Sequence, residues 1–463
     1  MVRSSLPAAR NSVVALWFVL LGLVSLLGGA FFGCIAAMQF VYAGFASFVP
    51  FVSNRPLHVS LVVAWIFFSA IGGIYYYLPQ WSGGWWHASR MQRVHFGLSV
   101  IVGTCILACY FFGIFGGREY WEYPPVFSAF IAVAWAIFGI NFFLAVRTLR
   151  GRWPVYVWMW ATGIVFFMIT FGESNLWLLP AIRNDPIRDV TVQWKAYGAL
   201  FGSWNMLVYG TSLFLMERIS GNRDVAWSKS AFLLYALGFV NLLFGWAHHI
   251  YVVPVSPLIG GIAYVVSMSE WILFFRIIYN WRKTVSAARM HSWLFSYRFL
   301  VTADGWIFLN ILLALLISIP AINVFTHGTH ITVAHAMGST IGINTMILLA
   351  SCYYIVYDSA KSPAAARPVA AELWGWIVLN ASLVLFWLML IVAGIEKGIL
   401  VARGVEFHAV MAAITPFMRA FAWSGIGVFV GLALVVVPLG TRLIRELAVG
   451  AERQPATTVL QPD

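Results

Sequence analysis

Apolar residues dominate this chain in long uninterrupted runs, and polar residues gather in short stretches between them. A run of about 20 apolar residues is long enough for a helix to cross the hydrocarbon core of a bilayer, which is about 30 Å thick. The pattern predicts twelve spans, near residues 14–46, 58–78, 95–115, 125–147, 154–172, 196–216, 230–252, 257–279, 296–318, 328–357, 369–394 and 412–440. We therefore expect an all-α integral membrane protein, a bundle of twelve transmembrane helices.

The charges of the connections orient this predicted bundle. Connections after even-numbered spans carry clusters of Lys and Arg, such as Arg147, Arg150 and Arg152, whereas those after odd-numbered spans are nearly neutral. Because positive loops stay in the cytoplasm, both termini are predicted to be cytoplasmic. The first run is too long for a signal peptide, so we expect it to be a retained helix. Residues 1–449 are predicted to form one membrane domain, and residues 450–463 a disordered cytoplasmic tail.

Composition agrees with a membrane protein and excludes some functions. Of the 463 residues, 62% are hydrophobic and 10% are charged, against about 25% charged in a soluble domain. The net charge is +12, but the basic residues lie in alternate loops, which argues against binding of nucleic acid. The four cysteines fall inside apolar runs and form no CxxCH motif, so the chain attaches no c-type heme itself.

Histidines collect at one depth of the predicted bundle. Six of the ten lie at or just inside its periplasmic third, namely His58, His248, His249, His327, His330 and His335. A single such histidine is most simply an interfacial or interhelical hydrogen-bonding residue. Histidines from three helices at one depth are what heme or metal ligation requires.

Five stretches carry a family resemblance. They are HVSLVVAWIFFSAIGGIYYYLP from His58, GREYWEYPP from Gly117, WAHHIYV from Trp246, SMSEWILFF from Ser267 and FTHGTHITVAHAMG from Phe325. With these five stretches in this order, the chain resembles the large, heme b-binding subunit of bacterial cytochrome c-dependent nitric oxide reductase, in the heme-copper oxidase superfamily. The resemblance implies a twelve-helix subunit in the bacterial inner membrane that takes electrons from a cytochrome c subunit and reduces NO to N₂O.

The resemblance also implies a set of ligands. His58 matches an axial ligand of low-spin heme b, and His335 matches the ligand of high-spin heme b3. His248 and His249 match ligands of a non-heme metal, iron or copper. Glu122 matches a glutamate associated with a structural calcium, and Glu270 matches a buried glutamate near the active site.

Two positions depart from the family pattern. Where the family has the second low-spin heme ligand, this chain has Met337, which either ligates heme through its thioether or only packs; His330 is a further candidate. In the sixth span, Tyr197 stands in place of a metal-binding histidine and Phe201 in place of a glutamate. A phenylalanine cannot bind a metal, whereas a tyrosinate binds ferric iron once its pKa is lowered from about 10.

These departures leave two functions open. The first is a divergent nitric oxide reductase-type enzyme acting on NO or a related diatomic such as O₂, with Tyr197 and Glu270 as candidate catalytic residues. The second is a catalytically degenerate heme-binding paralogue that senses NO, transfers electrons or assists a reductase. Altered chemistry enabled by Tyr197, such as O₂ reduction or NO disproportionation, is a weaker third reading. Few ionisable residues lie deep in the inner leaflet, so no proton pumping is expected.

Overall fold

A computed structural model describes residues 13–81, 89–147, 151–251, 253–254, 256–286, 290, 293–360 and 368–452. Within these residues the chain is helical and has no strand. The elements are α1 (Val13–Val41), α2 (Phe51–Trp81), α3 (Ser89–Phe111), α4 (Val126–Val146), α5 (Val155–Glu173), η1 (Leu176–Leu178), α6 (Pro180–Arg183), α7 (Pro186–Ser220), α8 (Asp224–Trp227), α9 (Lys229–Phe244), η2 (Gly245–Ile250), α10 (Pro257–Thr284), α12 (Leu294–Ser318), α13 (Pro320–Thr326), α14 (His330–Met337), η3 (Gly338–Thr345), α15 (Met346–Ser359), α16 (Ala370–Ala402) and α17 (Phe407–Glu452).

The helices confirm the predicted architecture. In the described part of the chain, eleven helices are long and apolar enough to cross a membrane. The remaining predicted span, 257–279, falls within the 28 residues of α10. Four helices extend well beyond their predicted spans. Helix α2 begins at Phe51 rather than near 58, α7 begins at Pro186 rather than near 196, and α16 ends at Ala402 rather than near 394. Helix α17 is longer at both ends and runs to Glu452. The predicted tail otherwise lies outside the described residues, so its disorder and the division into domains stay predictions.

Two predicted spans are not regular α-helices throughout. The span 230–252 changes at Gly245 from α9 into the 3₁₀ turn η2. The span 328–357 contains the π-helical segment η3 between α14 and α15. Single π-helical segments inside α-helices are rare and are frequent at functional sites. Both irregular segments carry or directly follow the predicted histidine ligands.

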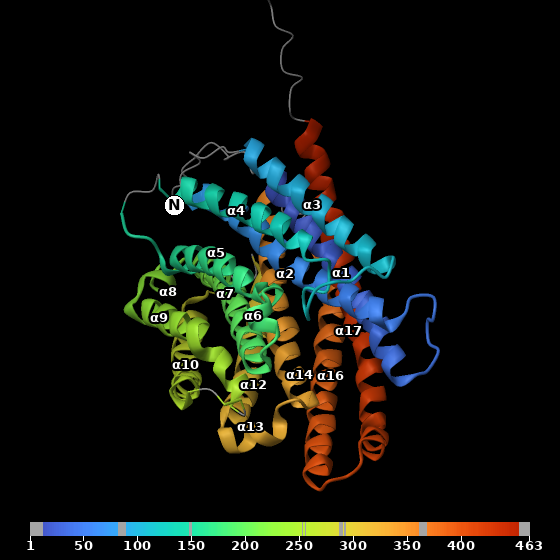
Figure 1. The fold of residues 1–463 in the computed structure, drawn as a ribbon. Helices are drawn as coiled ribbons and strands as arrows, with labels where there is room; N and C mark the ends of the chain where they lie inside the picture. Colours follow the sequence, from blue (N-terminus) through green and yellow to red (C-terminus); the bar gives the residue numbers. More distant parts are fainter. Residues whose placement is uncertain are drawn as a thin grey trace, which may run out of the picture.

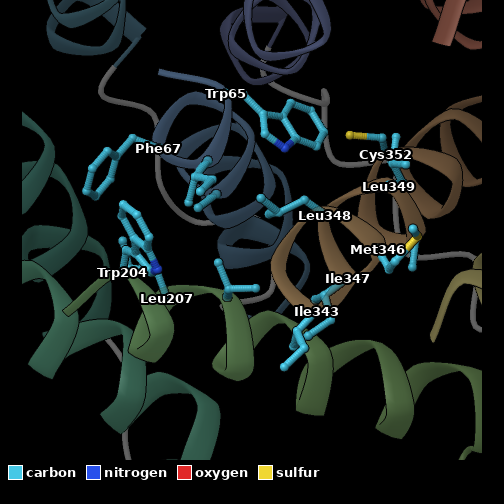
Figure 2. Packing of buried hydrophobic residues seen from close by; sticks show 14 of the residues in the cluster. Trp65, Phe67, Trp204, Leu207, Ile343, Met346, Ile347, Leu348, Leu349 and Cys352 are labelled. Atoms are coloured by element: carbon cyan, nitrogen blue, oxygen red, sulfur yellow. The ribbon is translucent and has the colours of Figure 1, made fainter. Parts of the chain in front are cut away.

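The helices form layers around α2, α7 and α15. Figure 1 shows α3 and α4 as an outer layer over α1 and α2, with α16 and α17 as a long antiparallel pair beside them. In Figure 2, Trp65 of α2 lies beside the α15 residues Leu349 and Cys352, and Phe67 points toward Trp204 of α7. The Trp65 indole N–H also donates to Thr345 Oγ1 at 3.1 Å, which ties α2 to η3. The central layer thereby fixes the helices that carry the histidines.

Candidate functional site

His58 lies near the outer end of α2 and is fixed by helix α1. Its Nδ1 is 2.7 Å from the main-chain oxygen of Gly29, so Nδ1–H donates and Nε2 keeps its lone pair. A Cβ at Gly33 would lie 2.6 Å from the same Nδ1, which shows how closely α1 packs against the ring. A histidine held by a carbonyl through one nitrogen is oriented to ligate through the other. The surroundings of His58 therefore fit an axial heme ligand.

His248 and His335 face one cavity of about 200 Å³. His248 comes from η2, and neither of its ring nitrogens has a hydrogen-bond partner among the described residues. His335 comes from α14, and its Nδ1 likewise has none there. Asn205 and Asn310 add side-chain amides to the wall of the same cavity. Buried polar atoms are normally paired, so the unpaired nitrogens of His248 and the unpaired Nδ1 of His335 on one cavity fit a heme ligand facing a metal ligand.

His249 extends this cluster away from the cavity. Its ring lies 4.2 Å from that of His248, centroid to centroid, and is stacked on Trp194 at 4.6 Å and 6°. The ring of His327 meets it nearly edge-on at 5.9 Å. The sequence places His327 at this depth but assigns it no role, and its Nε2 also lacks a partner among the described residues.

The cluster is not arranged as a closed metal site. Among the described residues, no group of three or more His, Cys, Asp or Glu side chains is placed to hold a metal. His248 and His249 nevertheless provide adjacent imidazole nitrogens, the donor type that suits iron and copper. These two residues thus fit part of a ligand set, and their role as ligands stays a prediction.

Tyr197 and Phe201 lie on a face of α7 that is turned toward the loop between α3 and α4. The Tyr197 ring packs edge-on against Tyr120 at 5.3 Å, and Phe201 packs against Tyr120 at 5.5 Å and Trp204 at 4.4 Å. The Tyr197 hydroxyl is buried without a partner among the described residues.

Glycines occupy the face of α7 that meets η2 and α9. A Cβ at Gly198 would meet Trp246 Cα at 3.1 Å, and one at Gly202 would meet Leu242 Cα at 3.0 Å. The backbone of α7 therefore comes so close to η2 and α9 that no ligating side chain fits on this face of α7. Successive helical residues point about 100° apart, so Tyr197 and Phe201, each one residue before one of these glycines, point toward the α3–α4 loop instead.

Met337 and Glu270 are less completely described. Met337 is half-buried at the last position of α14 and packs against the main hydrophobic core. Its role as a heme ligand stays a prediction. Glu270 belongs to α10, but its side chain lies outside the described part of the structure.

Glu122 is paired with an arginine on the helix that carries His58. Arg55 donates from one guanidinium nitrogen to Glu122 Oε1 at 2.7 Å and from the other to Glu119 Oε1 at 2.6 Å. Burial raises the pKa of Glu122, and the charge of Arg55 opposes that shift. Because the guanidinium already stands where it neutralises both carboxylates, these residues by themselves do not fit a calcium site. The calcium implied by the resemblance stays a prediction.

Comparisons with known proteins cover nearly the whole chain. The family described as cytochrome C and quinol oxidase polypeptide I matches residues 13–434. A nitric oxide reductase subunit from Stutzerimonas stutzeri is 22% identical over 422 residues, which are 84% of this chain and 85% of that protein. A heme-copper terminal oxidase solved as a dimer by cryo-EM has a TM-score of 0.66 at 13% identity, covering 99% of this chain and 86% of that one. The chain therefore belongs to the cytochrome c and quinol oxidase polypeptide I family of multi-pass membrane oxidoreductases.

Proposed function

We propose that this chain is a nitric oxide reductase-type heme b oxidoreductase that reduces NO to N₂O in the outer leaflet of the bacterial inner membrane. The observation that carries the proposal is the cavity between His335 and His248, where both ring nitrogens of His248 and Nδ1 of His335 are buried without a partner among the described residues. The balanced reaction is 2 NO + 2 H⁺ + 2 e⁻ → N₂O + H₂O. The 22% identity to a nitric oxide reductase subunit over most of both chains supports this substrate.

Each histidine has a distinct part in this proposal. His58, with its Nδ1 held by Gly29, would hold the low-spin heme b, and His335 would hold the high-spin heme b3. His248 and His249 would hold the non-heme iron or copper. Glu270 is a further candidate ligand, and Tyr197 would become one only by turning away from its contact with Tyr120. When bound, these groups supply the electrons and the Lewis acidity for cleavage of an N–O bond.

The chain's own residues would position the substrate and exclude water. Asn205 accepts a hydrogen bond from Asn344 at 3.1 Å and is thereby fixed in the cavity wall. Asn310 Oδ1 has no partner within the described residues and lines the same wall. Apolar residues such as Ile307 and Ile343 form much of the remaining wall. The fixed amides would orient a small polar diatomic, and the apolar wall around them would keep bulk water out.

Electrons would come from a cytochrome c subunit, and protons from the periplasm. The basic connections support cytoplasmic termini. Asp304, one of the few charged residues toward the inner leaflet, is already paired with Arg282 at 3.3 Å. We therefore expect turnover without proton pumping. Uptake of protons from the cytoplasmic side of sealed vesicles during NO reduction would contradict this.

A second candidate function is a heme-binding paralogue without NO reductase activity, acting as an NO sensor, electron carrier or accessory subunit. The observation that favours it is the packing of Phe201. At the position where the resemblance expects a glutamate ligand, its ring fills a contact between Tyr120 and Trp204. That arrangement supplies no oxygen ligand to a metal.

The deciding experiment is heme and metal analysis of the purified chain with reduced-minus-oxidised and CO-difference spectra. Two hemes b, one additional iron or copper and a CO-reactive high-spin heme per chain support the enzyme, and anaerobic NO consumption is then measured. A single heme, or no second metal in the intact chain, contradicts the enzyme and supports the paralogue. His408→Ala, at an exposed residue, controls for histidine loss in the matched His248→Ala and His335→Ala variants.

A further inference from the structure

A groove that shares no residue with the histidine cavity lies between the α13–α14 segment and the end of α16. This α13–α16 groove has a volume of about 380 Å³ and is lined from Phe325 to Ile331 on one side and from Gly394 to Arg403 on the other. Figure 1 shows α13 and α14 beside the part of α16 that leads to the turn into α17. At about 1.5 Å per residue, the stretch of α16 is about 14 Å long. This length is close to the hydrocarbon thickness of one leaflet, about 15 Å.

Two glycines of α16 bring the helix and the α13–α14 segment into close contact along the groove. A Cβ at Gly394 would lie 2.5 Å from the main-chain nitrogen of Ile331, and one at Gly398 would lie 2.8 Å from the carbonyl oxygen of Phe325. The backbone of the α13–α14 segment therefore lies directly on α16. Such closely packed contacts leave little room for repacking, so the groove is formed before any ligand binds.

The wall of the groove is apolar over most of its length. Phe325, Ile395 and Ile399 line it and are each 44–56% exposed. Thr326 also lines it, but its hydroxyl already donates to the carbonyl of Ile322 at 3.2 Å. None of the described residues in this wall is Asp or Glu. The wall therefore favours a hydrocarbon chain over a polar ligand.

Arg403 places a positive charge at one end of the groove. It directly follows α16, in a connection that the loop charges place on the periplasmic side. Its backbone is fixed by the helix cap: Gly404 is left-handed, its N–H donates to Val401 at 3.0 Å, and the N–H of Val405 donates to Leu400 at 3.1 Å. None of the ion pairs in the described part of the chain involves Arg403. Its exposed guanidinium is thus available to an anion.

The order of these features matches a phospholipid of the outer leaflet. Such a lipid has its phosphate at the membrane surface and its acyl chains below, and the groove has a guanidinium at its outer end and apolar side chains below. Guanidinium groups bind phosphate through paired, charge-assisted hydrogen bonds. A partner's transmembrane helix, about 10 Å wide, is a poorer match, because α13 has seven residues and would offer it a wall of only about two turns.

We propose that the α13–α16 groove binds one phospholipid of the outer leaflet, with its phosphate on Arg403 and one acyl chain lying between α13 and α16. The bound lipid also packs on Ile331, which lies in the groove wall four residues before His335. Occupation of the groove therefore stabilises the start of α14, the helix that carries His335. Binding requires neither heme nor the non-heme metal, so it does not depend on the proposed function.

The test measures lipid binding to the full chain by native mass spectrometry. The purified chain is delipidated in detergent and titrated with dioleoylphosphatidylglycerol, and the wild type should retain one lipid after all others have been removed by collisional activation. Arg403→Gln should weaken this binding about fivefold, the effect of one arginine at a membrane surface. Arg183→Gln is the matched control, because Arg183 is an exposed arginine of α6 that does not line the groove.

A second pair of variants tests the site of the acyl chain. Ala402→Trp should abolish the retained lipid, because Ala402 lines the groove and an indole would fill it. Ala412→Trp is its control, at an exposed alanine of α17 outside the groove. Dioleoylglycerol, which has the same chains but no phosphate, should bind more weakly than the phospholipid. No retained lipid in the wild type, equal retention within either pair of variants, or equal binding of dioleoylglycerol would each overturn the proposal. Heme content, measured on the same samples, separates these outcomes from failure of the proposed function.

Discussion

Gly33 controls the position of the His58 ring, and replacing it with alanine gives the sharpest test of the low-spin heme site. The new Cβ would lie 2.6 Å from His58 Nδ1 and 2.8 Å from Cε1. Ordinary contacts begin near 3.4 Å, so the ring must move by roughly 0.6–0.8 Å. The hydrogen bond from Nδ1 to Gly29, now 2.7 Å, lies on the same side and would be stretched beyond its working range.

The expected magnitude follows from two contributions. Overpacking a close helix contact costs about 1–3 kcal/mol, and losing one hydrogen bond costs about 0.5–1.5 kcal/mol. If both act on heme binding, affinity at His58 falls by at least about tenfold. Gly28→Ala is the matched control in the same helix, because its Cβ meets only the flexible end of Leu61, at 3.2 Å. Any change in helix propensity is the same in both variants.

The assay is the heme-to-protein ratio of each purified variant, together with the reduced absorbance of low-spin heme b and the thermal unfolding midpoint. We expect Gly33→Ala to lose low-spin heme while the CO-reactive heme is retained, and Gly28→Ala to match the wild type. Equal low-spin heme in the two variants would refute the claim that α1 orients the axial ligand. A fall in both hemes together would show that the substitution perturbs the whole bundle instead.

Three further predictions concern other parts of the site. His248→Ala should reduce the non-heme metal at least about tenfold while heme content stays unchanged, and His408→Ala should alter neither; equal metal in both variants, measured by mass spectrometry, would contradict the ligand role. Met337→Leu should abolish the six-coordinate low-spin spectrum, and Met337→His should restore it at a lower reduction potential, because His/Met ligation raises the potential; an unchanged spectrum in Met337→Leu would assign this residue to packing. Arg55→Gln should raise the pKa of Glu122 further above its ordinary value, because the opposing charge of Arg55 is lost. The variant should therefore lose stability relative to the wild type as pH rises from about 4.5 through the raised pKa. A deficit in melting temperature that is the same at every pH would argue against an electrostatic coupling of Arg55 to Glu122.

The fold was predictable because length and hydropathy determine it. A membrane helix must satisfy its own backbone and present apolar side chains to lipid, and both requirements are visible in a single sequence. The irregular segments that interrupt two of the helices were not visible in the sequence. Nothing in the run from 328 to 357 reveals that η3 is π-helical, because that geometry depends on neighbours such as Trp306, whose ring would contact a Cβ at Gly342.

The types of residue in the candidate site could be predicted from the sequence, but the directions in which their side chains point could be predicted less well. The sequence predicts a site where histidines collect at one depth, and the structure places His248 and His335 on one cavity, while their roles as ligands stay predictions. The orientation of Tyr197 depends on rotation about α7, and that rotation is fixed by contacts of Gly198 and Gly202 with η2 and α9. Packing of this kind joins residues far apart in sequence, so a linear pattern cannot reveal it.

Glycines are the part of the sequence in which such contacts are encoded most directly. In a membrane, small residues allow two helices to approach until side chains on one touch the backbone of the other. Gly29 and Gly33 do this at His58, and Gly394 does it where α16 meets the start of α14, near Ile331. Each contact would be lost with one added methyl group, whereas a glycine facing open space, such as Gly97, would tolerate it. Tolerance to alanine, scanned over all helical glycines, therefore distinguishes the contacts that orient ligands from glycines that only face lipid, and it does so without knowledge of the bound groups.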